Sequence, residues 1–204
     1  MRFYLIFIFL ICFVSYGQED RYILLIGNHS TICIDDSKVD RKTELPSSLE
    51  AYKTIFVFST STSTLRDKDV DRLIHFAEGG GGVYLGAENW PLQAEANQVT
   101  KRLYLKESFG EYQAEDAEIE SNNGNLELDS LKNVPAGRTT VAFPMDYRLK
   151  VEAWVDDQPL ILSGALEKGR VIIDGGYSRF YCDQRSDETD QLFQSFLLFL
   201  LQKN

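Results

Sequence analysis

The sequence predicts an α/β protein: a three-layer fold in which helices cover both faces of a mostly parallel sheet, with an antiparallel hairpin near one edge. Residues 55–58 form a continuous apolar run. Polar and apolar residues do not alternate there, as they would in a sheet with one face in solvent, so both faces of the sheet are expected to be covered. A helical pattern then separates this run from the apolar segment 82–86, the order of a parallel crossover. Residues 159–165 and 169–176 read as strands joined by a tight turn, which favours a hairpin.

The segment at residues 65–80 has the clearest helix pattern. Its apolar side chains share one stripe at helical spacing: Val70, Leu73, Ile74 and Ala77. Three aspartates load its first turns, where the helix dipole favours negative charge. The four glycines at 79–82 end the helix and lead into the strand GVYLG.

Other elements are expected along the rest of the chain. They are strands at residues 21–28, 31–35, 53–60 and 148–154, a helix at 93–105, an irregular acidic insertion with one or two short strands at 107–138, and a closing helix at 187–202. The closing helix is expected to turn six apolar side chains inward: Leu192, Phe193, Phe196, Leu197, Leu200 and Leu201.

The first 17 residues read as a secretory signal peptide. One positive charge at Arg2 precedes an apolar run from Phe3 to Val14, and small residues stand three and one before Gln18. The apolar run falls short of the ~20 residues that span a bilayer, so no stable membrane span is expected after cleavage. Lipid attachment at Cys12 is disfavoured by the bulky residues before it. We expect an exported, periplasmic or extracellular protein with one domain at residues 18–204.

Charge and cysteine content limit the partners. The chain has 21 Lys and Arg against 31 Asp and Glu, a formal net charge of −10, so nucleic acid is an unfavourable partner. Cys33 and Cys182 remain after cleavage and either form one disulfide or stay as two buried thiols. With no Cys/His cluster, neither a metal nor another cofactor is expected.

The order of these elements, with GVYLG early and KGRVIIDGG late, resembles the class I glutamine amidotransferase-like fold, especially its noncatalytic exported and ThuA-like members. In the catalytic branch of that superfamily, a cysteine nucleophile follows the strand that matches GVYLG, and a histidine with a glutamate two residues beyond follows a later strand. Here the first turn reads Gly86, Ala87, Glu88, and residues 177–179 contain no histidine. The resemblance therefore implies that glutaminase chemistry is absent, and whether any other enzyme activity remains is left open.

The resemblance and the strand pattern together predict where a ligand would bind. Loops at the carboxyl ends of parallel strands form the usual crevice of an open α/β sheet. We expect six side chains to share one cleft there: Glu88, Asn89, Trp90, Asp174, Tyr177 and Arg179.

Several of these side chains also have a purely structural interpretation. Glu88 and Asp174 are candidates for acid/base work on a glycosidic bond, but pairing of Glu88 with Arg179, and backbone hydrogen bonds to Asp174, are favoured because buried carboxylates are normally paired. Trp90 is either a platform for a sugar or hydrophobic peptide, or a side chain that packs its loop onto the sheet.

These observations favour a noncatalytic binding module that recognises a carbohydrate, a peptide or an envelope protein. The alternatives are a carbohydrate-processing hydrolase that uses Glu88 or Asp174, and an accessory subunit of an envelope complex.

Overall fold

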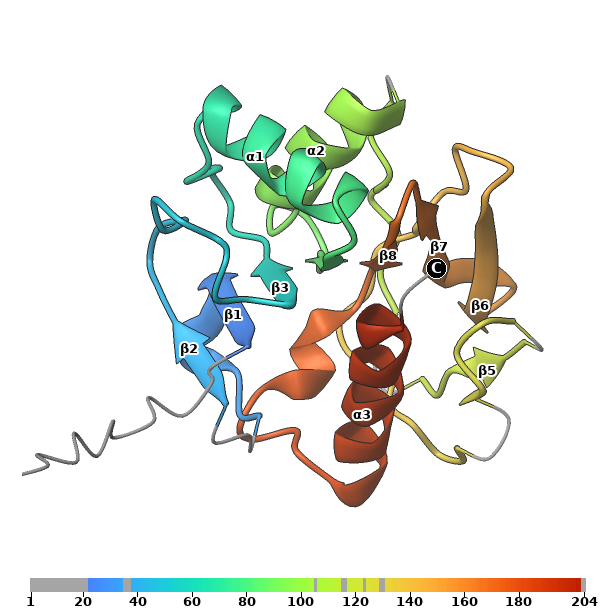
Figure 1. The fold of residues 1–204 in the computed structure, drawn as a ribbon. Coiled ribbons are helices and arrows are strands. Elements are labelled where there is room, and N and C mark those ends of the chain that lie inside the picture. The colour runs from blue at the N-terminus through green and yellow to red at the C-terminus, as the bar shows by residue number, and fades with distance from the viewer. Residues whose placement is uncertain are drawn as a thin grey trace, which may run out of the picture.

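The computed structural model describes residues 22–34, 38–104, 106–114, 117–122, 124–128 and 131–202. The expected signal peptide, its cleavage site and Cys12 lie outside the described residues. Eight strands form one sheet in the order β2-β1-β3-β4-β8-β7-β6-β5. The first five of these are parallel and the last four are antiparallel, with β8 common to both sets (Figure 1).

The strands and helices lie close to the expected positions. The strands are β1 (Ile23–Gly27), β2 (Val39–Arg41), β3 (Thr54–Phe58), β4 (Gly82–Gly86), β5 (Glu120–Ser121), β6 (Leu149–Val155), β7 (Gln158–Leu166) and β8 (Gly169–Asp174). The α-helices are α1 (Asp67–Glu78), α2 (Ala94–Tyr104) and α3 (Asp187–Leu201), and two 3-10 turns are η1 (His29–Thr31) and η3 (Tyr177–Phe180).

Helices lie on both faces of the sheet, as the apolar run at residues 55–58 predicts. Helices α1 and α2 cover one face and α3 covers the other (Figure 1). Along β3, Ile55 and Val57 belong to the apolar cluster under α1 and α2, whereas Phe56 and Phe58 belong to the cluster under α3. This alternation places an apolar core on each side of the strand and confirms the three-layer arrangement.

The glycines after α1 have separate roles. Gly80 has φ +111°, a conformation that side chains rarely adopt, and it turns the chain out of the helix. Gly81 lies beneath the Phe76 ring, so that a Cβ there would collide with it. The glycine run therefore brings the end of α1 close to the start of β4.

The prediction of a strand at residues 31–35 is wrong. His29–Thr31 forms η1, and Ile32 makes a single antiparallel bridge with Tyr181. The edge strand is instead β2, which pairs with β1 in parallel. The short apolar stretch at Thr31–Cys33 is used to bind the segment after β8 rather than to extend the sheet.

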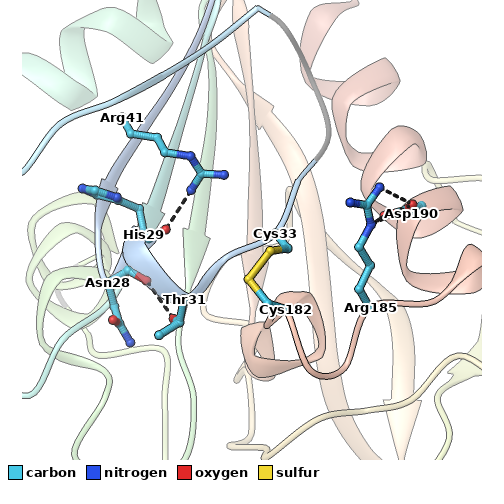
Figure 2. Close-up of a disulfide and its surroundings, with 8 residues drawn as sticks. All are labelled: Asn28, His29, Thr31, Cys33, Arg41, Cys182, Arg185 and Asp190. Atoms are coloured by element: carbon cyan, nitrogen blue, oxygen red, sulfur yellow. Dashed lines mark hydrogen bonds and ion pairs between the residues drawn. A yellow bond between two sulfur atoms is a disulfide. The ribbon is translucent and has the colours of Figure 1, made fainter.

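A disulfide joins the loop after β1 to the segment after β8 (Figure 2). The Cα atoms of Cys33 and Cys182 are 4.7 Å apart, which resolves the open choice between a bond and two free thiols. Backbone hydrogen bonds from Cys33 N to Phe180 O and from Cys182 N to Thr31 O flank the bond, both at 3.0 Å. The two loops are thus held together at the carboxyl edge of the parallel strands.

Candidate functional site

The loops after β4 and β8 lie side by side, as the sequence predicts. Gly86 and Asp174 are register partners at the ends of these two parallel strands. Ala87 N donates to Asp174 O at 2.8 Å, and Tyr177 N donates to Ala87 O at 3.2 Å. The residues that follow each strand therefore meet at one edge of the sheet.

Asp174 and Arg179 form an ion pair that is wholly enclosed. Both side chains are 0% exposed, and Arg179 Nη1 lies 2.9 and 2.8 Å from the two carboxylate oxygens of Asp174. Tyr84 Oη and the backbone N–H of Gly176 also donate to this carboxylate. The remaining Arg179 donors reach the carbonyls of Pro135 and Ala136. The expected pairing of Glu88 with Arg179 is therefore wrong, because the guanidinium points to Asp174, whereas the backbone hydrogen bond expected at Asp174 is present.

Tyr177 is also tied into the scaffold. Its hydroxyl donates to Ser59 O at 2.7 Å and accepts from Asn28 Nδ2 at 3.2 Å. Burial of the side chain raises the pKa of Tyr177 far above its ordinary value. The residue links the loops after β1, β3 and β8.

Glu88 is buried but only half satisfied. Its side chain is 1% exposed, and Tyr181 Oη donates to Oε2 at 2.8 Å. The other oxygen, Oε1, has no hydrogen-bond partner among the described residues. Burial raises the pKa of Glu88, while the hydroxyls of Tyr181 and Ser178 and the charge of Arg138 partly oppose that shift. An acceptor without a donor in such a place is costly and is therefore notable.

The next two residues lead from this carboxylate to the surface. Asn89 is half-buried, and its carbonyl accepts from Leu92 N at 3.1 Å, which closes the turn. Trp90 is 68% exposed, so its ring faces solvent instead of packing onto the sheet. Gln93 Nε2 holds the loop by donating to Glu88 O at 3.1 Å and to Gly110 O at 2.8 Å.

A second exposed ring stands on the segment next to this loop. Phe143 is 47% exposed, and its ring lies against Gly110, whose carbonyl accepts a hydrogen bond from Gln93. Ala142 N donates to Pro159 O at the start of β7, which places Phe143 at the carboxyl edge of β8. Gln93 thus ties the loop that carries Trp90 to the segment around Gly110, on which the Phe143 ring lies.

Sequence reasoning did not include Tyr181 in the site. Its side chain is half-buried, holds Glu88 and stacks edge-on against Tyr177 with ring centroids 5.9 Å apart. A usable signal was present, because Tyr181 directly precedes Cys182, and the disulfide fixes that segment beside the β1 loop.

A large groove lies at the opposite edge of the sheet. It has a volume of about 980 Å³ at the amino ends of β3 and β4. Among its lining residues are Tyr52, Lys53, His75, Phe76, Gly81 and Leu200. Its polar residues are partly used by the scaffold, since Tyr52 Oη donates to Asp40 at 2.7 Å and His75 Nδ1 lies 2.6 Å from Asp71 O.

The described part of the chain has neither a cluster of metal-ligating side chains nor a helix that could span a membrane. Within it, no group of three or more His, Cys, Asp or Glu side chains is placed to hold a metal ion. No helix there is both long enough and apolar enough to cross a membrane.

Comparison with known proteins identifies the fold. The sequence matches no family model and no curated protein. Its structure is similar to the cytoplasmic protein STM3548 from Salmonella typhimurium, with a TM-score of 0.63 and 14% identity over 88% of this chain and 98% of that one. It is also similar to a protein from Bacteroides uniformis described as ThuA-like, with a TM-score of 0.56 and 14% identity over 91% and 94% of the two chains. The chain has the ThuA-like fold.

The ThuA-like fold also occurs as a part of larger proteins. An exo-β-1,4-mannosidase from an Opitutaceae bacterium matches 89% of this chain with only 36% of its own length, at a TM-score of 0.51 and 14% identity. At such low identity these likenesses concern the fold alone, so the function has to be argued from the side chains at its edges.

Proposed function

We propose that this ThuA-like protein is a noncatalytic, exported binding module that recognises a carbohydrate at the loop formed by Glu88, Asn89 and Trp90. The observation that carries the proposal is the 68% exposure of the Trp90 ring, two residues beyond the buried Glu88 carboxylate. A large aromatic ring held in solvent offers an apolar face, and the C–H face of a sugar ring can stack on it. Asn89 supplies polar groups beside that face.

The arrangement of carboxylates supports binding over hydrolysis. Glycoside hydrolysis needs two carboxyl groups that both reach the scissile bond. Asp174 is fully enclosed and is occupied by Arg179, Tyr84 and Gly176, so it is already committed to the scaffold. Glu88 would have to act alone. The turn at Gly86–Glu88 also lacks the cysteine or serine that nucleophilic catalysis by an amidotransferase-like site requires.

Export is part of the proposal. The disulfide between Cys33 and Cys182 supports it, because such bonds persist in oxidising compartments outside the cytoplasm. The intact mass of the protein recovered from the exported fraction tests it. We expect a chain that begins at Gln18, and a mass that retains residues 1–17 would contradict export with cleavage.

The binding proposal is tested by screening the purified chain on a glycan microarray and titrating the best oligosaccharide by calorimetry. Replacing Trp90 by Ala should weaken binding at least about tenfold, the equivalent of about 1.4 kcal/mol, because stacking on the ring is lost.

The matched control is Tyr147→Ala. Tyr147 is 94% exposed and precedes Leu149, which pairs through Gly164 with Val171 near the amino end of β8. It is therefore an exposed ring away from the carboxyl edge, and its removal should leave affinity unchanged. Equal affinity for wild type and Trp90→Ala would overturn the proposal.

A further inference from the structure

The unsatisfied oxygen of Glu88 points to a chemical property of the ligand. Oε1 is buried without a hydrogen-bond donor in the described structure. Two hydroxyls near it are directed elsewhere, since Tyr181 donates to Oε2 and Tyr177 donates to Ser59 O. The Ser178 hydroxyl lies close enough to lower the pKa of Glu88 through hydrogen bonding, but its geometry leaves Oε1 without a donor. Among the described residues Oε1 therefore remains able to accept a hydrogen bond from a ligand.

The surroundings of Oε1 favour a cation over a neutral donor. The aromatic rings of Tyr177 and Tyr181 meet edge to face at 5.9 Å, and the exposed Trp90 ring follows in the same loop as Glu88. Aromatic faces attract ammonium groups, most strongly where water is excluded. The whole chain adds a formal charge of −10, which raises the local concentration of cations.

One positively charged side chain near Glu88, that of Arg138, opposes the binding of a cation. Arg138 lies near enough to Glu88 to favour its charged form. Its side chain is exposed, however, and its backbone N–H is bound by Ser178 Oγ at 2.7 Å. Solvent and salt screen an exposed guanidinium far more than they screen a contact with a buried carboxylate.

We infer that the carbohydrate carries a primary ammonium group and that Glu88 Oε1 receives it. This inference rests on the proposed function and specifies its ligand class. An ammonium donor satisfies the free oxygen and neutralises the enclosed charge, whereas a hydroxyl supplies the hydrogen bond alone. Because Glu88 is closed to solvent, this inference requires the half-buried Tyr181 ring to move when the amine binds.

The test compares oligomers of glucosamine and N-acetylglucosamine of equal length, at a pH where the free amines are protonated. Wild-type protein should bind the glucosamine oligomer at least about tenfold more tightly, and the preference should persist in high salt because the contact is buried. Glu88→Gln should bind both oligomers alike. Equal wild-type affinities for the two oligomers would overturn the inference without use of any variant.

A control separates this site from general attraction to an acidic protein. Glu111 is exposed, so Glu111→Gln removes one surface charge and should keep the preference. If it lowers the preference as much as Glu88→Gln does, the inference is wrong. Binding of both oligomers that depends on Trp90 but shows no preference refutes the ammonium inference alone, whereas affinities unaffected by Trp90→Ala refute the proposed function. Failure of both oligomers to bind contradicts the ammonium inference.

Discussion

At the scale of single residues, the carboxyl edge holds two buried carboxylates in opposite situations. Asp174 receives a guanidinium, a phenol and a backbone N–H, whereas Glu88 receives one phenol and keeps an oxygen free. Sequence spacing placed both side chains at this edge. It could not tell which of them Arg179 would reach, because that depends on how η3 turns the side chain.

The Asp174–Arg179 pair should be important for stability. Asp174→Asn leaves the enclosed guanidinium without its counter-charge, and we expect a loss of about 3–5 kcal/mol in the free energy of unfolding, measured by urea titration. The control is Glu107→Gln, which breaks an exposed pair with Lys101 and should cost about 1 kcal/mol or less. Equal effects of the two changes would refute the structural role given to Asp174.

The pKa of Glu88 predicts a specific pH dependence of stability. Burial raises this pKa above its ordinary value of 4.5, so the folded chain binds the proton more tightly than the unfolded chain does. The contribution of Glu88 to stability therefore falls as pH rises from about 4.5 through the folded pKa. Other carboxylates titrate in the same range, so the useful quantity is the difference between wild type and Glu88→Gln. We expect the urea midpoint of Glu88→Gln minus that of wild type to increase as pH rises. A decrease of this difference with pH would show that folding lowers the pKa of Glu88.

At the scale of elements, local patterns predicted most strands and helices. The apolar run of β3 and the stripe of α1 are readable because they reflect burial on adjacent elements. The strand prediction at residues 31–35 failed because Ile32 is buried against the segment after β8. One bridge and a nearby disulfide hold it there, and both join residues 149 positions apart in the sequence. Such long-range contacts leave no periodic signal.

Helix α3 should depend on its inner face. Phe196 is fully buried and contacts Tyr84 and Phe180, with ring centroids at 5.7 and 6.0 Å. Phe196→Ala should lower the free energy of unfolding by about 3–5 kcal/mol because it leaves a cavity among these rings. Leu198, on the same helix, is 65% exposed, and Leu198→Ala should stay within about 0.5 kcal/mol of wild type by urea titration. A large loss for Leu198→Ala would show that the outer face is also packed.

At the scale of the whole molecule, the disulfide closes most of the chain into one loop. It links Cys33 to Cys182 across 149 residues and holds the first and last parallel-strand loops together. Replacing both cysteines by serine should lower the free energy of unfolding by about 2–5 kcal/mol, since the unfolded chain regains its freedom. Addition of a dithiol reductant to wild type should give the same loss, and a reductant effect that persists in the double variant would point to another cause.

The two edges of the sheet offer competing places for a ligand. The carboxyl edge has exposed aromatic rings and a half-satisfied carboxylate, whereas the amino edge has a groove of about 980 Å³. We place binding at the carboxyl edge, because the exposed Trp90 ring there stands two residues from Glu88, whose buried Oε1 lacks a hydrogen-bond donor among the described residues. The groove at the other edge is lined in part by groups that already make hydrogen bonds within the protein.

Residue-resolved NMR titration of the exported chain with the oligosaccharide selected on the microarray tests this account most directly. We predict that backbone shifts change first and most at residues 88–90, at Arg138 and at residues 177–181, with a change at the Trp90 indole N–H. Shifts confined to residues 47–53 and 75–81, which line the groove at the amino edge, would contradict the account.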